Sequence, residues 1–293
     1  MLPLPRILLA ITLVSCATAP WLHAQQASRP DPALRVTLEQ IYQAWRNSME
    51  SGNHAQWEKT TALSRQIETK NRIVSQRLPF PQALFEDPVP SPSIEGMIPL
   101  GVLSTGETAT STYFGKPKFA VGPAAKDDVL LVLHFLREEG TWRFDNLRAV
   151  KLGNNAELLL KIRNSDFSFL TGEEFQPAKQ LPPLPQPVAP PAYLAEVWID
   201  STGHEVTITV NGHLTGEFAN ARANELVIGG LRAGNNSIRI ETKRIEASGS
   251  GRTPRVEVAI YAAKNPEDQA KRVYHHKPGS DFLPIVTETF SVE

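Results

Sequence analysis

The sequence predicts an α+β domain followed by an all-β sandwich, and three observations support this prediction. Helical periodicity is concentrated between residues 37 and 74. Segments typical of β-strands, separated by glycine and asparagine, make up most of the rest. Seven prolines between residues 176 and 191 divide the chain into two stretches, each long enough to bury a core. We therefore expect an α+β domain at residues 33–175, a semi-rigid linker at 176–191 and a sandwich at 192–293.

Residues 1–24 are typical of an export signal. Arg6 supplies a positive charge and precedes an apolar run, Ile7 to Val14, which is too short to cross a membrane. One processing route is cleavage after Ala24. The other depends on Leu13–Cys16, which resembles the lipobox of bacterial lipoproteins, where the cysteine becomes acylated. The sequence leaves both routes open, so we expect a periplasmic or secreted protein, or an envelope protein with a lipid anchor at Cys16.

The composition excludes several classes of partner. The 30 basic and 31 acidic residues nearly cancel, so no sustained field attracts nucleic acid. No membrane span is expected in the mature chain, and attachment to a membrane would require the lipid anchor. Cys16 is the only cysteine, so cleavage after Ala24 would exclude disulfides, thiolate nucleophiles and cysteine-ligated metals.

Two helices are expected at the start of the first domain. Thr37–Gln40 fits a capping box, and apolar residues then recur at helical spacing as far as Gly52, the expected C-cap. Asn53 is suited to cap a second helix. The predicted apolar stripes are Leu38, Ile41, Tyr42, Trp45 and Met49 in the first helix and Trp57, Leu63, Ile67 and Val74 in the second.

An antiparallel sheet is expected after these helices. Its strands are predicted at residues 97–104, 107–114, 129–137 and 141–150, with a tight hairpin at Glu139–Gly140. Ala156–Arg163 fits either a helix or a strand. Because helices precede a run of strands, we expect the helices to cover one face of a curved sheet.

The second domain is typical of β structure throughout. Strands are predicted at residues 194–200, 205–210, 213–218, 224–228, 236–245, 255–262 and 285–292. Asn211–Gly212 is a strong hairpin signal, because a type I′ turn needs positive φ at both central residues. Alternation along two of these strands predicts six core residues: Ala195, Val197, Ile199, Val206, Ile208 and Val210.

Three features of the first domain occur together: Ala44-Trp45 in the opening helix, a break at Ser51–Asn53 before a second tryptophan, and the late hairpin Glu139–Phe144. With them, residues 33–175 resemble the nuclear transport factor 2-like, or cystatin-like cone, superfamily. The resemblance implies a cone-shaped cavity between sheet and helices, which binds a small ligand, supports catalysis or is filled. Acid–base chemistry in such a cavity would use the polar types available, which are Tyr42, Tyr113, His134 and Asp145.

Two segments of the second domain also carry a resemblance. Thr207–Gly212 is a strand with its turn, and Gly230–Ile238 contains a G-x-N-x-I pattern at the start of a late strand. Residues 192–293 are similar in these respects to galactose-binding-like jelly-roll sandwiches. Turn chemistry alone places asparagine and glycine at such positions in many unrelated sandwiches.

The sequence contains no established catalytic or metal-binding motif. The nucleophile elbow, the P-loop, H-E-x-x-H and the calcium loop are all absent. His275 and His276 are expected in a solvated loop, and in a strand they would point to opposite faces. His134 lies in an apolar run, where a structural histidine is expected. We therefore expect no catalytic residue, no bound metal and no cofactor.

The pattern around Trp198 is the strongest indication of a binding site. Glu196, Trp198 and Asp200 alternate with core residues, so they share the polar face of their strand. Tyr261 lies on the polar side of a later strand in the same way. Aromatic rings beside charged groups are typical of sugar-binding surfaces, because rings cover the apolar sugar faces. The alternative is that Trp198 packs against the linker or the first domain.

Three functions remain open from the sequence. The leading hypothesis is a non-catalytic envelope protein whose sandwich binds a glycan or an envelope protein, with the cone domain as a second binding module. The second is an enzyme that acts on a small molecule in the cone cavity. The third is a structural or assembly protein without a ligand.

Overall fold

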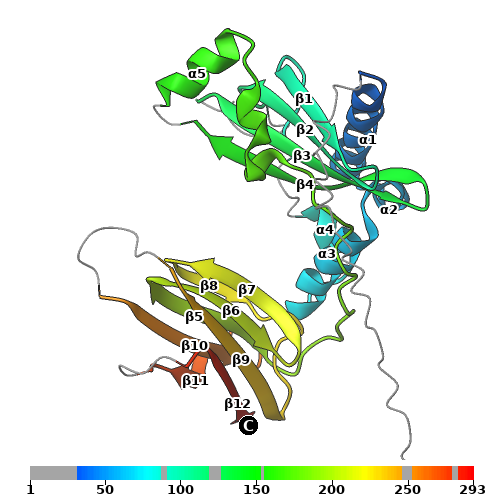
Figure 1. The fold of residues 1–293 in the computed structure, drawn as a ribbon. Coiled ribbons are helices and arrows are strands. Elements are labelled where there is room, and N and C mark those ends of the chain that lie inside the picture. Colours follow the sequence, from blue (N-terminus) through cyan, green and yellow to red (C-terminus); the bar gives the residue numbers. More distant parts are fainter. Residues whose placement is uncertain (1–31, 87–90, 119–126, 153–154, 246–252, 279–282) are drawn as a thin grey trace, which may run out of the picture.

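The computed structural model describes residues 32–86, 91–118, 127–152, 155–245, 253–278 and 283–293 (Figure 1). The predicted export signal and Cys16 lie outside these residues. Within these ranges the chain is mixed α+β and mostly β, with three antiparallel sheets of four strands each. None of the helices in the described ranges is long and apolar enough to cross a membrane.

Among the described residues, four helices precede the first sheet: α1 (Pro32–Ser51), α2 (His54–Thr60), α3 (Leu63–Ser75) and the short α4 (Gln82–Glu86). The predicted capping box at Thr37 is wrong, because α1 begins at Pro32 and the Thr37 hydroxyl donates to the carbonyl of Ala33 within the helix, at 3.2 Å. Proline is tolerated in the first turn because that turn leaves its backbone N–H groups unpaired.

The helix boundaries at Gly52 and Asn53 are confirmed. Gly52 has a φ of +66°, and the Asn53 side chain accepts a hydrogen bond from the backbone of Gln56 at 3.1 Å. The expected second helix is interrupted, however, at Thr61 and Ala62. The backbone N–H of Ala62 donates to the carbonyl of Phe144 at 2.8 Å, so this junction pairs with the sheet edge and separates α2 from α3.

The first sheet has the order β1-β2-β3-β4, from β1 (Ile98–Ser104), β2 (Thr108–Gly115), β3 (Val129–Glu138) and β4 (Thr141–Lys151). All four predicted strands and the hairpin between the last two are confirmed. Glu139 and Gly140 have φ values of +50° and +80°, as a type I′ turn requires.

Both faces of this sheet are covered, whereas the sequence predicted helices on one face only. Leu131, Leu133 and Phe135 of β3 pack into the cluster that contains Tyr42 and Trp45 of α1. Their neighbours on the other face of β3 belong to a separate cluster with α5 (Ala156–Arg163), η1 (Ser168–Thr171) and η2 (Glu173–Phe175). A strand that is apolar on both faces must be shielded from water on both. Ala156–Arg163, which the sequence left open between helix and strand, is a helix that packs on the second face.

The second part of the chain contains eight strands in two sheets, β11-β10-β5-β8 and β12-β9-β6-β7, an arrangement consistent with a β-sandwich. The strands are β5 (Leu194–Thr202), β6 (His204–Val210), β7 (His213–Ala219), β8 (Arg222–Leu226), β9 (Gly234–Arg244), β10 (Arg255–Ala263), β11 (Lys271–His276) and β12 (Ile285–Val292). The expectation of a loop at His275 and His276 is wrong, because both residues lie in β11, which pairs with β10.

The sandwich core follows the predicted alternation. The six residues predicted from β5 and β6 are all buried in one cluster, with exposed fractions of 3% or less. Asn211 and Gly212 have φ values of +50° and +84°, which confirms the hairpin between β6 and β7. Asn236 fixes the loop before β9, since its side chain bonds to both backbone groups of Arg232, each at 2.9 Å.

Candidate functional site

The four residues predicted from the alternation around Trp198 lie on one outer face of the sandwich. In the sheet β11-β10-β5-β8, Trp198 is paired with Ala259 on one side and with Asn224 on the other. Glu196 is paired with Tyr261. We call this surface, with Glu196, Trp198, Asp200, Asn224 and Tyr261, the outer face.

The two rings of the outer face are accessible to different extents. Tyr261 is exposed, with 37% of the residue accessible to solvent, whereas Trp198 is half-buried. The guanidinium of Arg222 on β8 lies over the Trp198 ring, 5.4 Å from its centre, in a cation–π contact. Trp198 is therefore supported by a neighbour of its own sheet.

Two carboxylates of the outer face already have partners within it. Asp200 receives a two-pronged contact from Arg255, with Nη2 2.7 Å and Nε 3.2 Å from the carboxylate oxygens. Glu196 accepts a weaker hydrogen bond from the side-chain amide of Asn224 at 3.3 Å. The alternation that placed Asp200 on this face did not indicate that it pairs with Arg255.

A further charged group on β10 and β11 continues this face. Glu257 lies 2.9 Å from His275 Nε2 and 3.2 Å from Lys277 Nζ. Hydrogen bonds lower the pKa of Glu257, and the bond from His275 has a larger effect than the bond from Lys277. His276 instead approaches Glu288 of β12, at 3.9 Å, so the adjacent histidines point to different sides, as alternation requires. Among the described residues no cluster of three or more His, Cys, Asp or Glu is suited to hold a metal.

Tyr42 and Tyr113, the tyrosines predicted for a cone cavity, are core residues with satisfied hydroxyls. Tyr42 is fully buried, and its hydroxyl donates to the carbonyl of Pro92 at 2.7 Å. The Tyr113 hydroxyl donates to Glu39 at 3.0 Å and accepts from Ser111 at 2.9 Å. Burial raises the pKa of both tyrosines far above their usual range, so neither is suited to act as a base.

The other two predicted cavity residues lie away from the tyrosines. His134 is opposite Thr110 in β2, whose hydroxyl donates to the carbonyl of Phe175 at 2.7 Å, so His134 belongs to the face that η2 covers. Burial lowers the pKa of His134, and the charge of Asp145 opposes this effect. Asp145 is held by Arg65 Nε at 3.4 Å. The four residues do not converge on one site.

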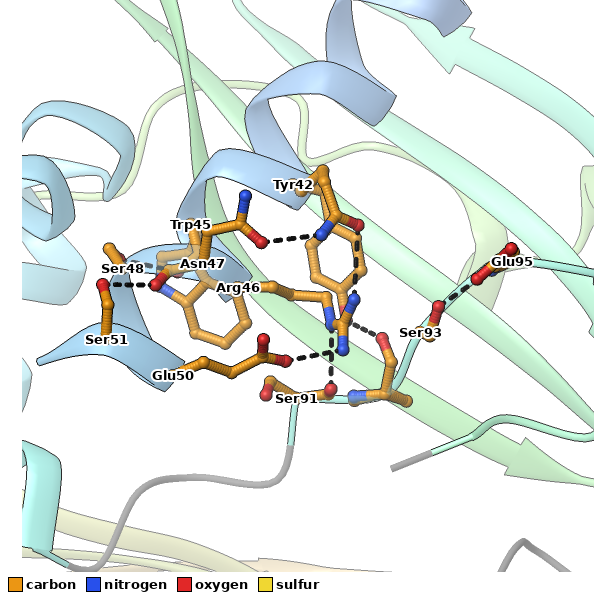
Figure 2. Close-up of polar contacts among 12 residues, drawn as sticks. Tyr42, Trp45, Arg46, Asn47, Ser48, Glu50, Ser51, Ser91, Ser93 and Glu95 are labelled. Carbon is orange, nitrogen blue, oxygen red and sulfur yellow. Dashed lines mark hydrogen bonds and ion pairs between the residues drawn. The ribbon is translucent and has the colours of Figure 1, made fainter. Parts of the chain in front are cut away.

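Arg46 on α1 is a buried charged residue that the sequence patterns did not reveal (Figure 2). It is 7% exposed, and its guanidinium donates to the carbonyl of Ser91 at 3.0 Å and to Glu50 at 2.8 Å. Together with the bond from Tyr42 to Pro92, these contacts fasten residues 91–92 to α1. The i, i+4 spacing of Arg46 and Glu50 beside Trp45 is the one signal for it in the sequence. We assign Arg46 a structural role.

The proline-rich segment is bound to α3 and does not behave as a free spacer. The Asn71 carboxamide donates to the carbonyl of Gln186 at 2.8 Å and accepts from the N–H of Val188 at 3.1 Å. The Arg77 guanidinium donates to the carbonyls of Pro191, at 3.0 Å, and of Ala192. Asn71 is only 4% exposed, so these contacts are shielded from water.

The same helix also contacts the sandwich directly. The Ser75 hydroxyl accepts a hydrogen bond from the N–H of Gly229 at 2.7 Å, and Arg72 forms an ion pair with Glu225 of β8 at 2.7 Å. α3 therefore lies between the first sheet and the sandwich (Figure 1) and contacts both the linker and the sandwich.

Comparison of the chain with protein-family models, with curated proteins and with solved structures gives no match.

Proposed function

We propose that the protein is a non-catalytic, exported carbohydrate-binding protein of the cell envelope, and that the outer face of its sandwich is the binding surface. The observation that carries this proposal is the position of Trp198 and Tyr261 on the polar face of a sheet whose other face supplies the apolar core of the sandwich. Rings at such positions contribute nothing to the core of the sandwich.

The geometry of the outer face suits an extended sugar. Trp198 and Tyr261 are diagonal neighbours on adjacent strands, and such positions are roughly 7–8 Å apart. Rings at this spacing can cover the apolar faces of neighbouring sugar units. Glu196 and Asn224 flank the rings, and both are exposed and able to bond to hydroxyl groups.

The finer family assignments belong to the same proposal. A helix-first domain with a four-stranded antiparallel sheet supports a nuclear transport factor 2-like cone, and two four-stranded sheets support a galactose-binding-like jelly roll. In the proposed cone, Tyr42 and Tyr113 are buried core side chains, and their hydroxyls already have hydrogen-bond partners. This favours a supporting role for the first domain over an enzyme. Export, with or without a lipid at Cys16, completes the proposal.

A protein partner at the outer face is the second candidate. Arg222 already covers one side of Trp198, and Arg255 already neutralises Asp200. Tryptophan, tyrosine and arginine are the residue types enriched at the centres of protein interfaces. A partner protein would use the preassembled pair Trp198–Arg222, whereas a sugar would compete with Arg222 for the ring.

A glycan array with the mature full-length chain tests the proposal. Trp198→Ala should weaken binding of the selected glycan by about tenfold or more, which corresponds to ~1.4 kcal/mol. Trp142→Ala is the matched control, because Trp142 is also half-buried under an arginine, Arg137, but belongs to β4 of the other domain.

Two outcomes would refute the sugar proposal: no glycan binds the wild-type chain, or Trp198→Ala binds as well as Trp142→Ala. A purified envelope protein that binds the wild-type chain but not Trp198→Ala would establish the second candidate instead. If neither ligand type binds, the structural or assembly function remains.

A further inference from the structure

A pocket of about 320 Å³ lies where the linker meets one end of the sandwich. One wall is the linker segment Pro187–Ala192, and another is the loop Gly229–Ala233. Asn211 and His213, from the hairpin between β6 and β7, complete it. Its size is at the lower end of the range for small-molecule sites, and junctions of this kind are common places for them.

The walls of this junction pocket are firmly held. Gly230 has a φ of +55°, and a Cβ at this position would clash with the ring of Pro191, so the loop packs closely against the linker. Asn71 fixes the linker wall from the outside, through Gln186 and Val188. On the other wall, the side chain of Asn236 accepts hydrogen bonds from Arg232 N and Asn211 Nδ2, both at 2.9 Å. The pocket is thus preformed.

The polar side chains of the junction pocket favour a negatively charged ligand. Arg232, His213 and Asn211 are the residues with polar side chains in its lining, and no carboxylate contributes to it. The Asn211 side chain is already bonded to Asn236 and to the N–H of Ser237. The Arg232 guanidinium is exposed and has no hydrogen-bond or ion-pair partner among the described residues.

We propose that the junction pocket binds a sugar-sized organic molecule that carries an oxyanion, either a carboxylate or a phosphate. Arg232 pairs with the oxyanion, because its planar guanidinium matches two oxygens at once. His213 supplies a second donor, and the prolines and Val188 of the linker face the apolar part of the ligand. This site is separate from the outer face and does not depend on the function proposed for it.

Isothermal titration calorimetry with the mature full-length chain tests the inference, with glucuronate, glucose 6-phosphate and glucose as probes. At least one of the two anions should bind tenfold or more tightly than neutral glucose. The anion that binds identifies the group as carboxylate or phosphate. Equal affinity for all three probes, or binding of none, would overturn the inference.

Arginine variants then locate the site. Arg232→Gln should reduce the affinity for the anion at least tenfold and leave the melting temperature unchanged, since the side chain is exposed and has no partner in the part of the chain that the structure describes. Arg163→Gln, an exposed arginine of α5, should retain wild-type affinity. His213→Gln provides a second test within the pocket and should also weaken binding. Undiminished binding by both pocket variants would show that the anion binds elsewhere.

Discussion

The carboxamide oxygen of Asn71 on α3 accepts a hydrogen bond from the backbone N–H of Val188 in the linker, 3.1 Å away. The amide group of the same side chain donates to Gln186 at 2.8 Å, so Asn71 bonds to the linker as a neighbouring strand would. A proline-rich segment offers few N–H groups and forms no internal hydrogen bonds. Pairing with a buried side chain therefore gives this linker a defined position.

Replacing Asn71 with alanine should loosen the linker. Both hydrogen bonds would be lost and two partly shielded backbone groups left unpaired, at a cost of about 1–3 kcal/mol in the free energy of unfolding. The direct measurement is hydrogen exchange at the Val188 amide, which should become markedly faster. Asn164→Ala, at an exposed position after α5, is the matched control. Equal protection of Val188 in both variants would show that Asn71 does not hold the linker.

Gly230→Ala should be more destabilising than Gly234→Ala. Both glycines have positive φ, at +55° and +78°, so an alanine at either costs about 1–2 kcal/mol from the backbone conformation. The two differ in their surroundings, because a Cβ at Gly230 would clash with Pro191 whereas none of the described atoms lies within 4 Å at Gly234. Overpacking of this kind adds roughly 1–3 kcal/mol.

Urea unfolding of the two glycine variants measures this difference. Gly230→Ala should also lose anion binding, because the clash would displace the linker, which forms a wall of the junction pocket. Similar stabilities for both variants would mean that the linker moves away from the loop at little cost.

His134 should make the stability of the protein depend on pH. Burial lowers the pKa of His134 in the folded chain, and Arg148 and Arg65 act in the same direction while Asp145 opposes them. As the pH falls below the unfolded value of about 6.5, the unfolded chain binds a proton that the folded chain does not. Stability is therefore retained above that pH and lost below it, with a slope of up to about 1.4 kcal/mol per pH unit.

His134→Gln tests this dependence. The free energy of unfolding of the wild type should decrease between about pH 7.5 and about pH 5.5, and the variant should show a smaller decrease over the same interval. This window lies above the range in which carboxylates usually titrate. Equal decreases in the two proteins would show that His134 is charged as readily in the folded chain as in the unfolded one.

Local sequence patterns predicted most of the helices and strands, and the elements that they did not predict have identifiable physical causes. Hairpin chemistry at Glu139–Gly140 and Asn211–Gly212 depends on two adjacent residues, so it could be seen in the sequence. The interruption between α2 and α3 could not, because it arises where Ala62 bonds to Phe144, more than eighty positions along the chain. Strand β11 was missed for the same reason, since its short segment becomes a strand by pairing with β10.

The candidate site likewise has features that the sequence predicted and features that only the tertiary structure shows. Period-two alternation determined from the sequence that Trp198 and Tyr261 would leave the core, because a strand turns successive side chains to opposite faces whatever its neighbours are. The tertiary structure alone decided which charges meet on that face and how the linker is held. Asn71 with Val188, Ser75 with Gly229 and Asp200 with Arg255 are pairs far apart in the sequence, and only folding brings their atoms together.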